Sequence, residues 1–407
     1  MNCRFCNKHV HLFISLGSSP LSNSYLTKDQ LNRMEQFYPL EVYVCDNCFL
    51  VQLQEFESPE SIFSEYAYFS SYSDIWLKHS QDYVNKMVDL FGIDTKSNVV
   101  EIASNDGYLL QYFKEKGVPV LGIEPACNVA EVAKEKGITT EVVFFGTETA
   151  RRLASEGKYA DFLLGNNVLA HVPDLNDFVE GLKILLKQHG VITMEFPHLM
   201  CLMEGTQFDT IYHEHFSYFS FLTVEKIFAA HGLAVFDVEE LLTHGGSLRI
   251  YAKHREDSMR PISERVCELR RIEADKGYQD INHYLTFSKK VEAVKRDILS
   301  FLIQAKYEGK TIVGYGAPAK GNTLLNYCGI KTDFIDYTVD RNPYKQGRYL
   351  PGSHIPIEAP DKISETKPDY VFILPWNIKA EIMEQLSYIC EWGGQFVVPI
   401  PKIEVYT

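Results

Sequence analysis

The chain of 407 residues is long enough for two or three domains. Its composition, 45% hydrophobic and 23% charged, excludes a disordered, collagen-like or coiled-coil protein. Its 40 basic and 54 acidic side chains give a net charge of −14, which disfavours general binding to nucleic acid or anionic membranes. We find no apolar run of the ~18 residues that a membrane span needs and no secretory leader. With nine cysteines, an odd number, a cytoplasmic protein is expected.

Residues 1–65 are predicted to form a small zinc-binding module. They contain two Cys-x-x-Cys pairs, Cys3 with Cys6 and Cys45 with Cys48, separated by 38 residues. Two such turns supply four thiolates, which complete a tetrahedral zinc site and leave no open position. The zinc is therefore expected to be structural, and a redox role for one pair is the alternative.

Apolar runs alternate with amphipathic stretches in the next region, 66–255, and again near the end of the chain. The predicted strands of this region are 98–102, 119–123, 140–144, 161–164 and 190–195, and its predicted helices are 107–115 and 128–136. Strands that alternate with helices in short units indicate a parallel α/β sheet. The last region, 256–407, is predicted to begin with a charged helical connector over 256–310. A second α/β unit follows, with strands at 310–314, 332–339, 369–374 and 394–399 and a helix at 379–388.

The first α/β unit opens with a strand, a tight turn and a helix, the arrangement of a nucleotide-type cofactor loop. Candidate cofactor residues at the strand end, in the turn and at the end of the next strand are Glu101, Ala103, Ser104, Asn105, Asp106 and Glu124. An acid at the position of Glu124 accepts hydrogen bonds from ribose hydroxyls. Asp106 would repel a pyrophosphate, whereas S-adenosylmethionine carries two cationic groups and no phosphate. The acids therefore favour S-adenosylmethionine over NAD, and a turn without a ligand is the alternative.

Three further residues follow predicted strands of the same unit. Phe145 closes the third strand, where an aromatic ring is placed to flank adenine, although an aromatic pair at 144–145 also suits a core. Asn166 and Asn167 follow the fourth strand, beside the cofactor cleft of an open sheet. All three are predicted cofactor-binding residues.

An ordered set of motifs runs over nearly the whole chain. After the four-cysteine module come EIASNDGYLL (101–110), GIEP (122–125), YHEHFSYFS (212–220), HGGSLR (244–249), GYGAPAK (314–320) and PGSHIPI (351–357). This set resembles the nucleotide-sugar C-methyltransferases, in particular the sugar C-3 methyltransferases of branched deoxysugar pathways. The resemblance implies an α/β protein with three parts: a zinc module, a class I Rossmann-like methyltransferase domain with S-adenosylmethionine, and a Rossmann-like C-terminal substrate-binding domain. It also implies a substrate of the dTDP-4-keto-6-deoxyhexose type.

The catalytic Tyr-x-Glu-His cluster of that family corresponds to Tyr212, Glu214 and His215. Methylation of a carbon beside a ketone needs a base, stabilisation of the enolate oxygen and an aligned methyl donor. We expect His215 to remove the C-3 proton, Glu214 to orient or support it, and Tyr212 to donate a hydrogen bond to the oxyanion. The resemblance also gives His171 a place near substrate or cofactor, which makes it the alternative base. A metal held by His213 and His215 is a further alternative, although HEH is not the HExxH signature.

Two other segments carry predicted active-site residues. The resemblance implies a tyrosine that closes over the active site, and Tyr66 fits the spacing better than Tyr68. Both tyrosines also suit ordinary packing. The HGGSLR turn places His244 either near the sugar or in an ordinary turn, with Arg249 exposed to solvent.

The turn GYGAPAKGN of the last α/β unit is predicted to bind the diphosphate of the substrate. Backbone amides at the start of a helix attract phosphate. Residues 311–350 also hold five basic and three acidic side chains, a local excess of +2. The candidates for substrate binding here are Gly316, Lys320, Asn322 and Lys345. The alternative for this unit is that it binds no ligand. The alternatives for the whole protein are an NAD(P)-dependent nucleotide-sugar reductase and a methyltransferase for another nucleotide-linked sugar.

Overall fold

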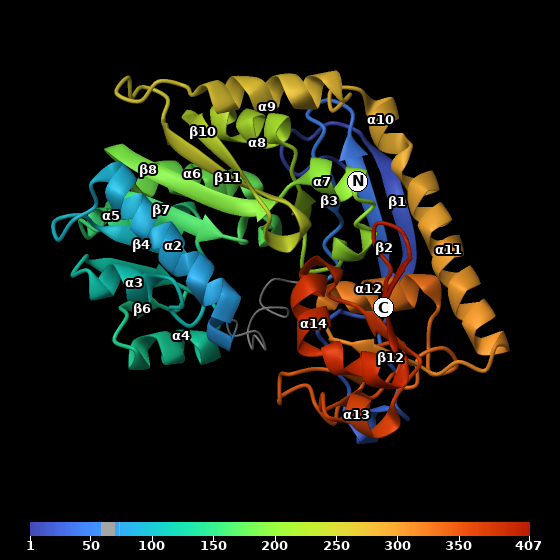
Figure 1. The fold of residues 1–407 in the computed structure, drawn as a ribbon. Helices are drawn as coiled ribbons and strands as arrows, with labels where there is room; N and C mark the ends of the chain where they lie inside the picture. Colours follow the sequence, from blue (N-terminus) through green and yellow to red (C-terminus); the bar gives the residue numbers. More distant parts are fainter. Residues whose placement is uncertain (58–69, 73) are drawn as a thin grey trace.

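The computed structural model describes residues 1–57, 70–72 and 74–407, whose strands form three sheets (Figure 1). The candidates Tyr66 and Tyr68 lie outside the described residues. Among the helices of the described ranges, none has the length and apolar character to cross a membrane.

The N-terminal sheet is antiparallel, in the order β1-β2-β3-β9. Its strands are β1 (Val10–Ser19), β2 (Tyr38–Cys45), β3 (Val51–Leu53) and β9 (Ser217–Tyr218). Strand β9 comes from a distant part of the sequence and pairs with β3, with Val51 opposite Tyr218. The sheet that carries the cysteines therefore also holds the segment that directly follows residues 212–215.

The central sheet has seven strands in the order β10-β11-β8-β7-β4-β5-β6. Its strands are β4 (Val99–Ile102), β5 (Val120–Ile123), β6 (Thr140–Glu141), β7 (Ala160–Asn166), β8 (Leu186–Pro197), β10 (Leu233–Leu241) and β11 (Ser247–His254). The five strands from β8 to β6 are parallel, and β11 lies antiparallel between β8 and β10. All four residues of β4 are buried, as expected of a parallel strand that is covered on both faces.

Helices connect these strands and lead to the last sheet. Those of the central region are α2 (Asp74–Phe91), α3 (Leu110–Glu115), α4 (Cys127–Glu135), α5 (Thr147–Ser155), α6 (Leu175–Leu185), α7 (Leu199–Glu204) and α8 (Phe221–Ala230). The connector consists of α9 (Glu264–Asp275), α10 (Ile281–Leu285) and α11 (Phe287–Tyr307). Figure 1 shows the connector running along the top and down the right side of the molecule.

The C-terminal sheet has the order β14-β13-β12-β15-β16-β17, with β17 antiparallel to its neighbour. Its strands are β12 (Ile312–Tyr315), β13 (Thr338–Val339), β14 (Ile357–Glu358), β15 (Tyr370–Ile373), β16 (Gln395–Val398) and β17 (Glu404–Tyr406). Its helices are α12 (Ala319–Cys328), α13 (Lys362–Thr366) and α14 (Lys379–Gln385). Short 3₁₀ turns lie at η1 (Lys28–Gln30), η2 (Ser70–Tyr72), η3 (Leu169–His171), η4 (Phe208–Thr210), η5 (Thr243–Gly245), η6 (Trp376–Ile378) and η7 (Ser387–Trp392).

The predicted α/β architecture is confirmed, while several element boundaries were wrong. The strand predicted over 190–195 spans 186–197, and the helix predicted over 107–115 begins at 110. Strand β6 ends at Glu141 instead of 144, because it is a short edge strand that pairs with β5 at two positions. Of the predicted strand 332–339 only 338–339 is extended, since backbone hydrogen bonds from 334 and 335 to the carbonyl of Lys331 form a turn. The helix predicted over 379–388 ends at 385 and gives way to η7.

Candidate active site

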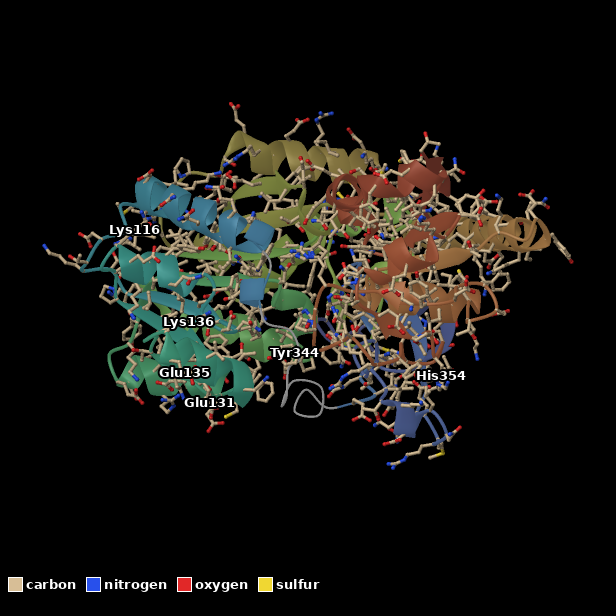
Figure 2. The ribbon with its side chains drawn as sticks, turned by 60° about the horizontal axis from the view of Figure 1, so that its bottom comes forward. Lys116, Glu131, Glu135, Lys136, Tyr344 and His354 are labelled. Carbon is tan, nitrogen blue, oxygen red and sulfur yellow. The ribbon has the colours of Figure 1, made fainter. Side chains whose placement is uncertain are left out.

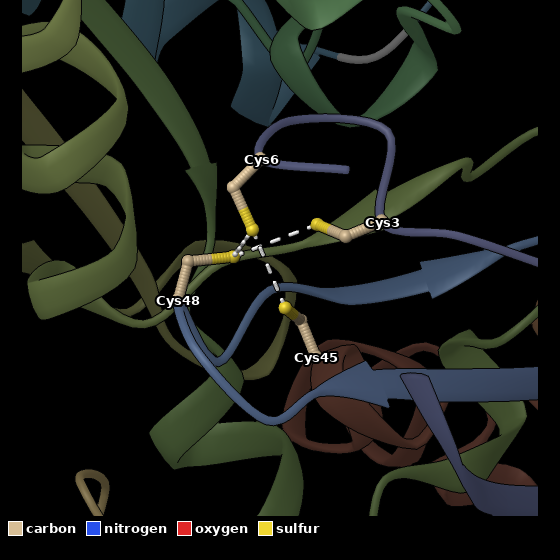
Figure 3. Close-up of side chains that lie close together, drawn as sticks. All are labelled: Cys3, Cys6, Cys45 and Cys48. Carbon is tan, nitrogen blue, oxygen red and sulfur yellow. Dashed lines mark hydrogen bonds between the residues drawn. The ribbon is translucent and has the colours of Figure 1, made fainter. Parts of the chain in front are cut away.

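The four cysteines of the N-terminal sheet converge on one point (Figure 3). One pair lies in the turn before β1 and the other at the turn after β2, and their sulfur atoms all lie within 4.8 Å of one another. The Sγ atoms of Cys3 and Cys48 are 3.5 Å apart, as are those of Cys6 and Cys45. A tetrahedral site with Zn–S bonds of about 2.3 Å places its sulfurs about 3.8 Å apart, so the cluster fits zinc.

The turn between β4 and α3 has an unusual backbone conformation. Ala103 and Asn105 have φ of 56° and 48°, in the left-handed region that residues other than glycine rarely adopt. The N–H groups of Asn105 and Ala126 donate to the two carboxylate oxygens of Glu124, each over 2.9 Å. This fixes Glu124 at the end of β5 and leaves each oxygen a second lone pair for a ligand hydroxyl.

Three acidic side chains surround this turn. Burial, and then the carboxylates of Glu124 and Asp106, raise the pKa of Glu101 well above its usual value, and burial also raises the pKa of Glu124. Lys136, at the end of α4, lies 3.4 Å from Oδ2 of Asp106 and donates to the backbone carbonyl of Asp106 over 2.9 Å. Figure 2 shows Lys136 near Glu135, the last residue of α4. The positive charge of Lys136 thus offsets the negative charge of Asp106 at this turn.

Buried polar atoms at the same edge of the sheet fit a bound polar ligand. The side-chain atoms Oδ1 and Nδ2 of Asn166, Oγ of Ser104 and Oδ1 of Asn167 have no hydrogen-bond partner within the described ranges. Buried amides and hydroxyls are normally paired, and ligands of open α/β sheets bind where parallel strands end. These atoms therefore fit the S-adenosylmethionine that the turn predicts.

Phe145 lies in the loop after β6, because that strand ends at Glu141. Its ring packs edge-to-face against Phe178 of α6, with 5.5 Å between the ring centroids. The expectation that Phe145 closes a strand was wrong. Its contact with adenine stays a prediction.

Within the Tyr-x-Glu-His motif, the partly buried Tyr212 and the buried His215 form a hydrogen-bonded pair. The hydroxyl of Tyr212 lies 2.9 Å from Nε2 of His215, and Nδ1 of His215 lies 3.1 Å from the carbonyl oxygen of Thr210. Because a carbonyl only accepts, Nδ1 carries the proton and Nε2 accepts from Tyr212. Burial, and then His171, lower the pKa of His215 well below its usual value. The imidazole is therefore neutral near pH 7 and able to take up a proton.

Glu214 faces Asn23, a residue of the loop after β1. Nδ2 of Asn23 donates to Oε1 of Glu214 over 2.6 Å. Burial raises the pKa of Glu214 to about 7, and the hydrogen bond from Asn23 opposes that rise. The sequence analysis missed Asn23, because the SNSY stretch around it has no recognisable motif. Only folding brings it to Glu214, 191 residues away.

His171 and His213 lie on different sides of His215. The ring of His171 packs edge-to-face on His215 with 4.7 Å between centroids, and burial lowers the pKa of His171 to about 4. His213 instead lies with Nε2 3.2 Å from the carbonyl oxygen of Pro39 and with its ring against Tyr38. Within the described ranges the two histidines of the HEH motif share no cluster of metal-binding side chains, so the active-site metal alternative finds no support.

The HGGSLR turn lies at the cofactor edge of the central sheet. His244 has φ of 55°, and its Nε2 accepts a hydrogen bond from Nδ2 of Asn167 over 3.2 Å. Its ring stands edge-on to Trp76 of α2. Arg249 is buried and pairs with Glu195 over 2.8 Å. The alternative of a solvated Arg249 is therefore wrong, because β11 lies inside the sheet.

Glu195, near the end of β8, is a second residue that the sequence analysis missed. It accepts hydrogen bonds from His79 of α2 and from the Thr243 hydroxyl, both over 3.1 Å. Burial acts to raise the pKa of Glu195, but His79 and Arg249 lower it to about 2. The sequence signal for Glu195 was an acidic residue inside the apolar run of the strand predicted over 190–195. The network joins α2 to the His244 turn.

The candidates of the C-terminal unit lie around the start of α12. Gly316 has φ of 87°, and a Cβ there would lie 2.6 Å from Cδ of Pro375, so only glycine fits. Nζ of Lys345 donates to the carbonyl of Ala317 over 2.9 Å. Nδ2 of Asn322 donates to the backbone of the N-terminal module over 2.6 Å. Lys320 lies on the first turn of α12, near residues 208–215.

The strand order of the central sheet, its acidic cofactor turn and the buried base cluster define a class I Rossmann-like methyltransferase. An S-adenosylmethionine-dependent methyltransferase from Clostridium acetobutylicum ATCC 824 has 10% identity and a TM-score of 0.35, over 44% of this chain and 92% of that chain. Magnesium protoporphyrin IX methyltransferase (ChlM) from Synechocystis PCC 6803 with bound SAM has 17% identity and a TM-score of 0.33, over 44% and 81%.

Family models match three successive stretches of the chain. They describe a zinc binding domain (residues 3–63), a methyltransferase domain (76–238) and a C-methyltransferase C-terminal domain (242–401). C-methyltransferase NovU from Streptomyces niveus is 36% identical over 406 residues, which cover 99% of this chain and 96% of that protein. The chain therefore belongs to the C-methyltransferase family and is an S-adenosylmethionine-dependent enzyme with a zinc module. The reductase alternative is set aside.

Proposed function

We propose that this enzyme methylates C-3 of a nucleotide-linked 4-keto-6-deoxy sugar, with dTDP as the nucleotide. The observation that carries the proposal is the neutral, buried imidazole of His215, hydrogen-bonded to Tyr212 at the edge of the cofactor sheet. A ketone acidifies the hydrogens of the adjacent carbon, and a neutral base near that carbon forms the enolate. Carbon methylation requires such a carbanion.

His215 is the base in this proposal, and His171 is the alternative base. Because the hydroxyl of Tyr212 donates to Nε2 of His215, the oxygen of Tyr212 is placed to take the C-3 proton while its own proton passes to Nε2. The ionised form of Glu214 stabilises the imidazolium that results. Burial of Glu214 and His215 keeps water from the enolate. Bound S-adenosylmethionine supplies the electrophilic methyl group.

The remaining predicted site residues complete the proposal. Cofactor binding falls to the turn and strand ends of the central sheet, with Glu124 as the ribose acceptor and Asn166 offering unsatisfied buried atoms. The start of α12 and Lys345 contribute to the nucleotide diphosphate. We also propose the division into regions 1–65, 66–255 and 256–407, a closing role for Tyr66 with Tyr68 as the alternative, and a cytoplasmic location.

Incubation with S-adenosylmethionine and a panel of nucleotide-linked 4-keto-6-deoxy sugars tests the function. Mass spectrometry is expected to show the gain of one methyl group, and NMR is expected to locate it at C-3. A methyl group at C-5, which flanks the same ketone, would correct the position but not the chemistry. If only sugars without a ketone were methylated, the proposal would be wrong.

A further inference from the structure

Lys320 reaches the reaction centre from the C-terminal unit. Helix α12 packs against the segment that precedes His215, since Oγ1 of Thr323 donates to the carbonyl of Ile211 over 2.9 Å. Lys320 lies almost one helical turn before Thr323. Its ammonium lies 4.9 Å from the ring centre of Trp376.

Trp376 connects Lys320 to both sides of the site. Its Nε1 donates to Oδ2 of Asp209 over 2.6 Å. A Cβ on Gly245 would lie 2.6 Å from Cη2 of Trp376, so the tryptophan also touches the turn that carries His244. The ammonium of Lys320 is thereby held between the segment 209–215 and the His244 turn.

The described residues use only part of the bonding capacity of this ammonium. Nζ of Lys320 donates to Oδ1 of Asn377 over 2.8 Å, and within the described ranges Lys320 forms no ion pair. An ammonium has three donors, so donors remain for a ligand. Burial lowers the pKa of Lys320, and Asp209 opposes that change.

The charge of Lys320 acts on the two imidazoles at the centre. Burial is the largest influence, but Lys320 also contributes to the lowered pKa of both His215 and His244. The ammonium therefore lies close enough to both rings for its charge to act on them. This assignment moves Lys320 from the diphosphate candidates to the reaction centre and leaves Gly316, Asn322 and Lys345 for the diphosphate.

We propose that Lys320 is a catalytic residue that contacts the ketone oxygen beside the methylated carbon and stabilises the enolate. This inference rests on the proposed function. The hydroxyl of Tyr212 has one proton and donates it to Nε2 of His215, so a different hydrogen-bond donor is needed at the developing oxyanion. When the carbon loses its proton, the C–H pair becomes a C=C bond and the carbonyl π pair moves to oxygen. In the methyl transfer, the C=C pair forms the bond to the methyl carbon, the S–C bond of the donor breaks with its pair left on sulfur, and an oxygen pair re-forms C=O. Lys320 keeps its protons throughout.

The test compares Lys320→Met with Lys320→Arg and with Lys306→Met, a lysine that pairs with Asp336 on the surface of the same unit. The probe is dTDP-4-keto-6-deoxyglucose at saturation, with free dTDP for binding. Lys320→Met is expected to lower kcat about 10²–10³-fold, with the Kd for dTDP changed less than about threefold. Lys320→Arg is expected to recover part of kcat, and Lys306→Met to match the wild type.

Deuterium uptake at the acidic carbon, measured in D₂O with S-adenosylhomocysteine bound, isolates enolate formation. This uptake is expected to fall in Lys320→Met in parallel with kcat. Two outcomes for Lys320→Met would overturn this inference but not the proposed function. The first is that kcat and deuterium exchange are unchanged. The second is that dTDP binding is weakened tenfold while kcat at saturation is normal. A wild-type enzyme inactive on every keto-sugar would overturn the proposed function and this inference with it.

Discussion

The hydroxyl of Tyr212 donates a hydrogen bond to Nε2 of His215 over 2.9 Å, while the carbonyl of Thr210 holds the Nδ1 proton on the other side of the ring. This pair of contacts selects one tautomer and aims the basic nitrogen at the tyrosine oxygen. In the proposed mechanism, Tyr212 and His215 therefore act as one proton-transfer unit.

Tyr212→Phe removes the oxygen of this unit and leaves the ring. We expect kcat for methyl transfer to fall about 10²–10³-fold, because the proton path to His215 is interrupted. The KM for the nucleotide sugar should change less than about threefold. The control is Tyr218→Phe, which removes a buried hydroxyl from another ring that packs on His215. Equal losses in the two variants would argue against the proton-transfer unit.

The hydrogen bond between Asn23 and Glu214 predicts a pH effect. The pKa of Glu214 is about 7, so its carboxylate is protonated below that pH, and kcat is expected to fall as pH drops through about 7. Asn23→Ala removes a donor that stabilises the ionised form, which raises the pKa and moves this fall to higher pH by about one unit. Asn23→Asp should move it further, because two carboxylates then face each other.

The profiles of kcat between pH 5.5 and 9 measure these shifts. Glu214→Gln has no group to titrate at this position, so its kcat should no longer fall as the pH drops through about 7. If the pH at which kcat falls on the acidic side were the same in both Asn23 variants as in the wild type, Glu214 would not control that fall.

The zinc cluster should control the catalytic segment but not the cofactor site. Cys48→Ser is expected to reduce bound zinc below one ion per chain, lower Tm and lower kcat, because β3 pairs with β9 directly after residues 212–215. Affinity for S-adenosylhomocysteine should change less than about threefold, since its residues lie on the central sheet. Metal analysis, thermal unfolding and calorimetry check these outcomes. Cys390→Ser, which alters an exposed cysteine, is the control.

The pair of Lys136 and Asp106 predicts a change in cofactor preference. Lys136→Met leaves Asp106 uncompensated at the turn, which favours the sulfonium of S-adenosylmethionine over neutral sulfur. The ratio of the Kd for S-adenosylhomocysteine to that for S-adenosylmethionine should rise about threefold to tenfold, and more at low salt. The exposed Lys116, on the same half of the molecule in Figure 2, provides the control Lys116→Met. An unchanged ratio would mean that Asp106 does not face the sulfonium.

Features that depend on short spacing and on periodicity could be predicted from the order of residues alone. The two Cys-x-x-Cys pairs predicted the sulfur cluster, and the alternation of apolar strands with helices predicted the parallel sheets. The acid at the end of β5, Glu124, was also visible, because a strand end and the turn before it are local features.

Contacts between distant side chains at the proposed site depend on how the chain folds as a whole. Asn23 meets Glu214, and Thr323 of α12 meets Ile211, through pairings far apart in sequence that no local pattern encodes. The same packing buried Arg249 and placed Lys320 beside Trp376. The physical reason is that periodicity fixes the face of each element, whereas the convergence of faces depends on how the three sheets pack together.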